Sequence, residues 1–139
     1  MDRVKSKIAD IELRHLNVFS RESGTLSSLE LEKEVPWSVQ RVFFINSVQE
    51  QDRGDHAHKE CIQAIVCLSG EVEIYCYDGE EEVIFHLSNL GQLLVVPPGI
   101  WLKLKFQAES SITVLASQEF FESDYIRSME EYKRYRLSK

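Results

Sequence analysis

The sequence has few cysteines, few prolines and no long apolar run, and each shortage excludes a class of protein. The 3 cysteines among 139 residues include no Cys-x-x-Cys pair and lie in apolar surroundings, which argues against a disulfide scaffold or a zinc ribbon. No stretch approaches the roughly 18 apolar residues needed to span a membrane, and no signal-peptide pattern follows Met1. We therefore expect reduced core thiols in a cytoplasmic globular protein.

Positive charge is also scarce. The chain has 16 Lys and Arg against 23 Asp and Glu, so its formal net charge is −7. Nonspecific binding to nucleic acid or to anionic lipid depends on clustered cations, so neither nucleic acid nor a membrane is expected as a partner. A few arginines could still gather around one small phosphorylated ligand. The sequence also lacks a glycine-rich phosphate loop and a serine nucleophile elbow.

Short strand-like segments separated by turns fill most of the chain, whose length fits one domain over residues 1–139. One of these segments is split by Asp78-Gly79, a hairpin signal. Regular spacing of this kind is typical of an antiparallel sandwich or barrel, so we expect an all-β fold with its barrel over about residues 40–118. The segments lie at 41–46, 61–70, 71–87, 91–106 and 110–117.

The two ends of the chain carry different patterns. A weaker apolar-polar alternation, with a turn at 23–25, predicts N-terminal strands over about residues 8–35. Tyrosine and methionine residues recur at intervals of three and four over 123–136, behind a Ser-Asp start. That spacing predicts a short amphipathic C-terminal helix over about 123–136.

Two of the 4 histidines, His56 and His58, stand one residue apart. Side chains two residues apart share one face of a strand, so both imidazoles should look into the mouth of the apolar interior. The same parity places Ile62, Ala64 and Val66 on the histidine face. The alternative is a pair of rim histidines that bond to the backbone.

The residues around the pair resemble the two-part cupin motif in type and order. After His58 come Gln63 and Gly70, and later Gly91, Pro97, Gly99 and Leu102. In metal-binding cupins the positions of Gln63 and Leu102 hold a Glu and a His ligand. Two imidazoles and a neutral amide make a poor metal site, so we expect neither a metal nor another cofactor. The histidines instead suit proton transfer, because an imidazole has an unperturbed pKa of about 6.5.

A closer resemblance, over roughly residues 20–130, is to the sugar 3,4-ketoisomerases that act on dTDP-4-keto-6-deoxyglucose, a metal-independent cupin family. It rests on Arg-Gly-x-His-x-His-Lys at 53–59, Gly-x-Trp at 99–101 and Asp-Tyr-Ile-Arg at 124–127. The resemblance implies a cupin jelly roll or β-barrel, usually a homodimer, that moves a keto group from C4 to C3 of the hexose. Its substrate would be a dTDP-linked keto-deoxyhexose.

The resemblance also implies roles for individual residues. His56 is the leading candidate for the base that removes the C3 proton, and His58 is the second active-site imidazole. Arg41 and Arg53 match positions for the nucleotide diphosphate, which needs about two charge-assisted partners. Gln63 could bind the sugar or satisfy a strand neighbour, and Trp101 could line the pocket or belong to the core. The expected substrate-binding set is Arg41, Arg53, Lys59, Gln63 and Trp101.

Three positions depart from the family pattern. Ser23 replaces a Tyr or Arg before the early turn glycine, Leu102 replaces a His or Arg, and Asp55 replaces an aromatic residue. The leading hypothesis is an isomerase in the synthesis of a deoxy amino sugar for a surface glycan, such as an O-antigen, or for a glycosylated metabolite. One alternative is a non-catalytic cupin that binds a sugar nucleotide, because Ser23 and Leu102 take the place of polar site residues. Another is a metal-dependent cupin enzyme such as a dioxygenase.

Overall fold

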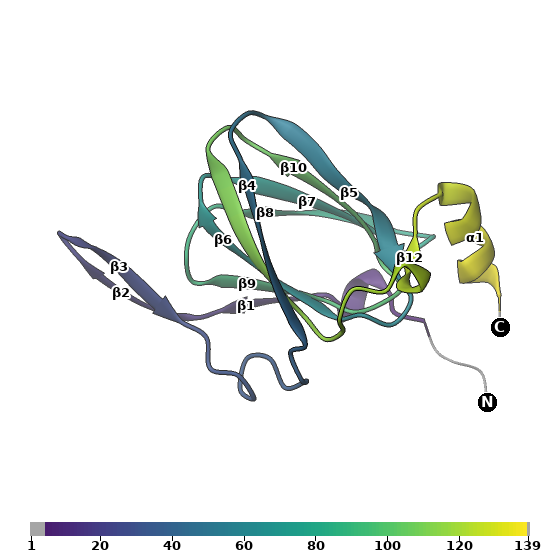
Figure 1. Cartoon of the computed structure of the whole chain (residues 1–139), viewed down its shortest axis with the longest axis horizontal. Helices are drawn as coiled ribbons and strands as arrows, with labels where there is room; N and C mark the ends of the chain where they lie inside the picture. The colour runs from purple at the N-terminus through teal and green to yellow at the C-terminus, as the bar shows by residue number, and fades with distance from the viewer. Residues whose placement is uncertain (1–4, 139) are drawn as a thin grey trace.

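Two antiparallel five-stranded sheets face each other in the computed structural model, which describes residues 5–138 (Figure 1). The first sheet has the order β1 (Glu12–His15), β9 (Gln92–Val96), β6 (Gln63–Ser69), β11 (Ser110–Ala116) and β4 (Arg41–Ser47). The second has the order β12 (Tyr125–Ile126), β5 (Gln51–His58), β10 (Trp101–Phe106), β7 (Val72–Tyr77) and β8 (Glu82–Leu87). The expected all-β architecture is confirmed.

Alternating sequence patterns produce the core between the sheets. In β7, every second residue (Val72, Ile74 and Cys76) is buried, while the residues between them are only partly covered. The two inner faces bury these residues together with leucines and isoleucines from the opposite sheet. All three cysteines are buried and free, as expected for core thiols.

The N-terminal region holds a 3₁₀ turn (Ile8–Asp10), β1, and the hairpin formed by β2 (Asn17–Arg21) and β3 (Gly24–Ser28). This hairpin extends away from the two sheets, on the side opposite the C-terminal helix (Figure 1). Apolar residues on it are exposed to solvent: the exposed fractions are 44% for Val18, 62% for Phe19 and 60% for Leu26. The predicted N-terminal strands are therefore present, but two of them lie outside the sandwich.

The C-terminal helix, expected over about 123–136, is shorter than the sequence pattern suggests. Helix α1 spans Met129–Leu137, and a 3₁₀ turn (Glu122–Asp124) and strand β12 precede it. The cap is Ser128, whose hydroxyl accepts a hydrogen bond from the amide of Glu131 at 3.1 Å. Residues Tyr125–Ile126 instead pair with the end of β5, and this edge pairing replaces the first turn of the predicted helix.

Within the described residues, no helix has both the length and the apolar character needed to cross a membrane.

Candidate active site

A β-bulge in β5 decides which of its side chains face the interior. Leu102 lies opposite His56 and Lys103 opposite Gly54, so Asp55 is an extra residue with no partner on β10. Gly54 and Asp55 have φ angles of 82° and 62°, a conformation that glycine and aspartate tolerate better than most residues. Arg53 and His56, three residues apart, would lie on opposite faces of a regular strand. The bulge lets both line the same cavity.

This cavity, of about 260 Å³, lies between the two sheets. Most of its wall is apolar and includes Leu102, which is only 2% exposed and stands directly opposite His56 on β10. An apolar cavity with a few convergent polar groups is the usual form of a small-molecule site. The polar side chains that line it are Arg53, His56, Gln63 and Tyr125.

His56 is the titratable imidazole on the cavity wall. Burial, aided by the neighbouring His58 and by the charge of Arg127, lowers the pKa of His56 from 6.5 to about 4. Its Nδ1 atom is buried and has no hydrogen-bond partner among the described residues. At neutral pH the ring is therefore uncharged and able to accept a proton.

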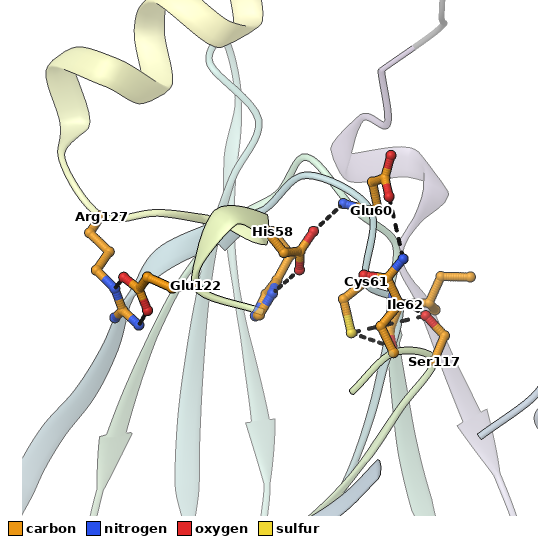
Figure 2. Close-up of polar contacts among 9 residues, drawn as sticks. His58, Glu60, Cys61, Ile62, Ser117, Glu122 and Arg127 are labelled. Carbon is orange, nitrogen blue, oxygen red and sulfur yellow. Dashed lines mark hydrogen bonds and ion pairs between the residues drawn. The ribbon is translucent and has the colours of Figure 1, made fainter. Parts of the chain in front are cut away.

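His58 lies behind His56, outside the cavity wall. The side chain of His58, which Figure 2 labels, is buried, and its Nδ1–H donates to the Asp124 carboxylate over 2.8 Å. Burial alone would raise the pKa of Asp124, but hydrogen bonds from His58 and from the Glu60 amide outweigh burial and hold that pKa below its usual value. The ring centroid of His58 lies 5.0 Å from that of His56 and 4.4 Å from that of Tyr125.

One buried group of side chains has the composition of a partial metal site. His58, Cys61 and Asp124 offer a nitrogen, a sulfur and an oxygen within 4.8 Å of one another. The Asp124 oxygens already bind His58 and the Glu60 amide, and the Cys61 thiol donates to a backbone carbonyl at 3.5 Å. On the cavity wall, the cupin ligand positions supply one imidazole, one amide and an aliphatic side chain, a donor set that suits proton transfer better than metal binding.

Two functional candidates were missed by the sequence reading, which assigned Tyr125 to the apolar face of a helix and gave Asp124 no role. Tyr125 lines the cavity, and its ring lies 5.0 Å from that of His56. The Arg127 guanidinium stands 4.4 Å above the Tyr125 ring and forms two hydrogen bonds to Glu122, at 2.7 and 2.9 Å. The signal available in the sequence was the Asp-Tyr-Ile-Arg motif, which contains Asp124, Tyr125 and Arg127.

The remaining predicted binding residues lie outside the cavity. Trp101 is 4% exposed, packs on Tyr132 at 5.4 Å and donates to the Asp55 carboxylate at 3.0 Å, so it is a core residue under α1. Lys59 is exposed and borders a separate depression beside Asp124. Arg41 begins β4 and stacks over Phe43 and Phe120, and its Nε is buried without a partner among the described residues.

The expected placement of Ile62, Ala64 and Val66 is wrong. All three lie in or against a cluster on the outer side of the first sheet, while Gln63 and Ile65 face the cavity with His56. The chain bends after Lys59 and passes from the second sheet into the first, so parity is not carried across the bend. The structure thus brings Arg53, His56 and Gln63 together at the cavity and places His58 behind them.

Comparison with known proteins agrees with this geometry. Residues 9–137 match the family model described as FdtA: WxcM-like, C-terminal. A curated relative, the TDP-4-oxo-6-deoxy-alpha-D-glucose-3,4-oxoisomerase of Aneurinibacillus thermoaerophilus, is 35% identical over 116 residues, which cover 81% of this chain and 82% of the relative.

Solved structures of similar proteins have the same fold, and two of them are sugar 3,4-ketoisomerases. QdtA, a sugar 3,4-ketoisomerase from Thermoanaerobacterium thermosaccharolyticum solved with TDP, superposes with a TM-score of 0.86 at 29% identity, over 93% of this chain and 96% of QdtA. The WlaRB TDP-quinovose 3,4-ketoisomerase from Campylobacter jejuni gives a TM-score of 0.84 at 30% identity, over 91% of this chain and 99% of WlaRB. The cupin-type β-sandwich expected from the sequence is confirmed.

Proposed function

We propose that this chain, which belongs to the FdtA family of WxcM-like C-terminal domains, is a dTDP-sugar 3,4-ketoisomerase. The reaction moves the keto group of a dTDP-linked 4-keto-6-deoxyhexose from C4 to C3. The observation that carries the proposal is an uncharged imidazole, His56, on the wall of an apolar cavity. Burial lowers its pKa to about 4, so the ring is a free base at neutral pH.

The chemistry needs one base and no redox partner. His56 removes the proton at C3, and the electron pair of the C3–H bond forms the C3–C4 double bond of an enediol. The proton of the C3 hydroxyl passes to the C4 oxygen, the C3–O bond becomes the new carbonyl, and the electron pair of the C3–C4 double bond takes a proton from the imidazolium at C4. One imidazole can make both transfers if they occur on one face of the sugar.

The polar groups near His56 suit the rest of the substrate. Gln63 lines the cavity and offers an amide to the sugar oxygens, while Arg53 supplies a cation for the diphosphate. Arg41 adds a second cation, and the exposed Phe120 beside it offers a ring on which thymine can stack. Trp101 lies outside the cavity and holds Asp55, and with it the bulge, through a hydrogen bond. Lys59 also lies outside the cavity.

Incubation with dTDP-4-keto-6-deoxyglucose in D2O, followed by proton NMR, tests the proposed activity. The expected result is a 3-keto product and incorporation of deuterium at C3 or C4. Saturable binding of dTDP without product or exchange would instead identify a non-catalytic sugar-nucleotide-binding cupin. Leu102→His makes a useful companion variant, because it restores a polar group directly opposite His56.

The lowered pKa of His56 predicts the pH dependence of catalysis. The ring stays uncharged above its pKa, so kcat/KM should remain level as the pH falls below 6.5 and should decline only towards pH 4. An acid limb centred near 6.5 would contradict the assignment. Circular dichroism at each pH is the control, because the unfolded chain takes up this proton below 6.5 and the folded state therefore loses stability between 6.5 and about 4.

A second copy of this chain is the partner that the exposed apolar surface suits. On edge strand β4, Val42 and Phe44 are 46% and 71% exposed, and the outlying hairpin β2–β3 adds Phe19 at 62%. Exposed apolar side chains gathered on one element are typical of interaction sites. The hairpin, whose turn includes Ser23, extends away from the two sheets of its own chain (Figure 1), so we propose a homodimer in which the hairpin packs on the partner.

Sedimentation velocity tests the dimer. The wild type should sediment with twice the mass of one chain, and Phe19→Asp should shift the population towards monomer at micromolar concentration. Ile84→Asp is the matched control, because Ile84 is equally exposed (61%) but lies on β8 of the other sheet. A monomeric wild type, or equal dissociation of both variants, would contradict the proposed interface.

The place of the enzyme in metabolism is proposed from the chemistry of its product. A 3-keto sugar nucleotide is ready for transamination at C3, so we propose that the enzyme acts in the cytoplasm before a transaminase, in the synthesis of a deoxy amino sugar for a surface glycan such as an O-antigen.

A further inference from the structure

Two buried ring nitrogens of the histidine pair have no hydrogen-bond partner among the described residues. They are Nδ1 of His56 and Nε2 of His58. The two rings stand 5.0 Å apart, centroid to centroid, and meet edge to face at 87°. Unpaired buried polar atoms are costly, so two of them on neighbouring rings call for a functional reason.

Asp124 determines which nitrogen of His58 carries the proton. Its Oδ2 lies 2.8 Å from Nδ1 of His58, and its Oδ1 accepts the amide of Glu60 at 2.7 Å. An ionised carboxylate only accepts hydrogen bonds, so Nδ1 is the donor, and in the singly protonated ring Nε2 keeps a lone pair. The carboxylate is fixed in place because its own backbone oxygen accepts the amide of Lys59 at 2.8 Å.

We propose that Asp124 and His58 are positioning residues for His56. Asp124 keeps Nε2 of His58 an acceptor, and in the substrate complex this atom receives the Nδ1 proton of His56. The Nε2 lone pair of His56 is then the one that faces the sugar. Hydrogen bonds of catalytic groups are often long before substrate binds and shorten in the complex, which accounts for the open contact between the two rings. The inference rests on the proposed ketoisomerase function.

The chain of hydrogen bonds leaves the proton balance of the reaction unchanged. His56 takes the C3 proton on Nε2 while its Nδ1–H continues to donate to His58, and after exchange with solvent the same Nε2 atom returns a proton to C4. The Asp124 carboxylate, one imidazole away, stabilises the positive charge that His56 carries in between. Neither His58 nor Asp124 exchanges a proton with the substrate.

Asp124→Asn tests the inference with little change of shape. The amide oxygen can still accept the Glu60 amide, but its NH2 group would donate to Nδ1 of His58, so the His58 proton moves to Nε2. We expect kcat to fall by about 10- to 100-fold, the usual effect of losing a group that orients a catalytic residue. KM should stay within about twofold, because no cavity contact changes. An unchanged kcat would overturn the inference.

Nitrogen-15 NMR of the histidines in the dTDP complex supplies a readout that a purely structural role would not move. In the wild type, both His56 and His58 should be protonated on Nδ1, and in Asp124→Asn both should be protonated on Nε2. The change at His56 is the one that a purely structural role of Asp124 would not produce. Glu130→Gln is the matched control, because this exposed acid pairs with Arg134 on α1, at 3.2 Å. Wild-type His58 protonated on Nε2 would refute the proposed role of Asp124.

A double-mutant cycle with His58→Gln tests whether Asp124 acts on His56 through His58 or independently of it. If Asp124 acts through His58, Asp124→Asn should have little further effect on kcat in the His58→Gln background, and multiplied losses would refute the chain. The NMR measurement needs no turnover. A wild type that fails to isomerise would therefore defeat the proposed function while its His58 tautomer is still measured, whereas an active wild type with a fully active Asp124→Asn variant defeats only this inference.

Discussion

Replacing His56 by Asn is expected to lower kcat for ketoisomerisation by about 10³- to 10⁴-fold, at the upper end of what a single general base contributes. His56 is the cavity-lining imidazole, and its lowered pKa of about 4 makes it a free base at neutral pH. Asn has similar polarity but cannot take up a proton. The variant should therefore stall at removal of the C3 proton.

Binding and exchange measurements complete this test. Because His56 is uncharged at neutral pH, its replacement removes no charge, and calorimetry should give a dTDP affinity close to that of the wild type. His86→Asn is the control, since His86 is half exposed on β8, away from the cavity, and pairs with Glu71 at 3.4 Å. Deuterium exchange at the wild-type rate in His56→Asn would remove His56 as the base.

Replacing Tyr132 by Ala is expected to lower the free energy of unfolding by about 3–5 kcal/mol, as for other large buried aromatic residues. Tyr132 is fully buried and contacts the rings of Trp101 at 5.4 Å and Tyr77 at 6.1 Å. Its hydroxyl donates to the carbonyls of Gly99 and Tyr77, at 2.7 and 2.9 Å. The truncation leaves a cavity under α1 and removes these hydrogen bonds.

Urea denaturation followed by circular dichroism measures the effect, with Tyr132→Phe as the control. Phe keeps the ring and loses only the hydroxyl, so its cost should be about 1–2 kcal/mol. The structural change in Tyr132→Ala should also affect the active site. Tyr132 binds the carbonyl of Gly99, and the Gly99 amide donates to the His58 carbonyl at 2.7 Å. Equal midpoints for Tyr132→Ala and the wild type would show that α1 does not anchor this end of the fold.

The all-β fold and the position of the site were predictable from the sequence because both depend on local patterns. An alternation of apolar and polar residues predicts the strands, and the turn residues Asp78-Gly79 predict the hairpin. His56 and Gln63 were found because a short motif places both at one cavity. Core burial of the three cysteines likewise follows from their apolar neighbours.

Other features depend on contacts between distant parts of the chain. Asp124 pairs with His58, which lies 66 positions earlier in the chain, and no local sequence pattern predicts this pairing. The predicted helix began too early because Tyr125 fits an amphipathic spacing, although pairing with the edge of β5 stabilises it as a strand. Trp101 directly follows a turn, a position that suggested a pocket residue. Its side chain instead lies under α1, on the side of β10 that faces away from the cavity.

The pairing of β12 with β5 also has a consequence for the order in which the site is assembled during synthesis. Both histidines and the residues of β4 and β6 on the cavity wall come before residue 70, whereas Asp124, Tyr125 and the anchoring helix α1 come after every other strand of the two sheets. Domains begin to fold as they emerge. Until this last segment docks, the edge of β5 is unpaired and His58 lacks its carboxylate partner, so we expect the site to become complete only when the C-terminal segment docks on the sandwich.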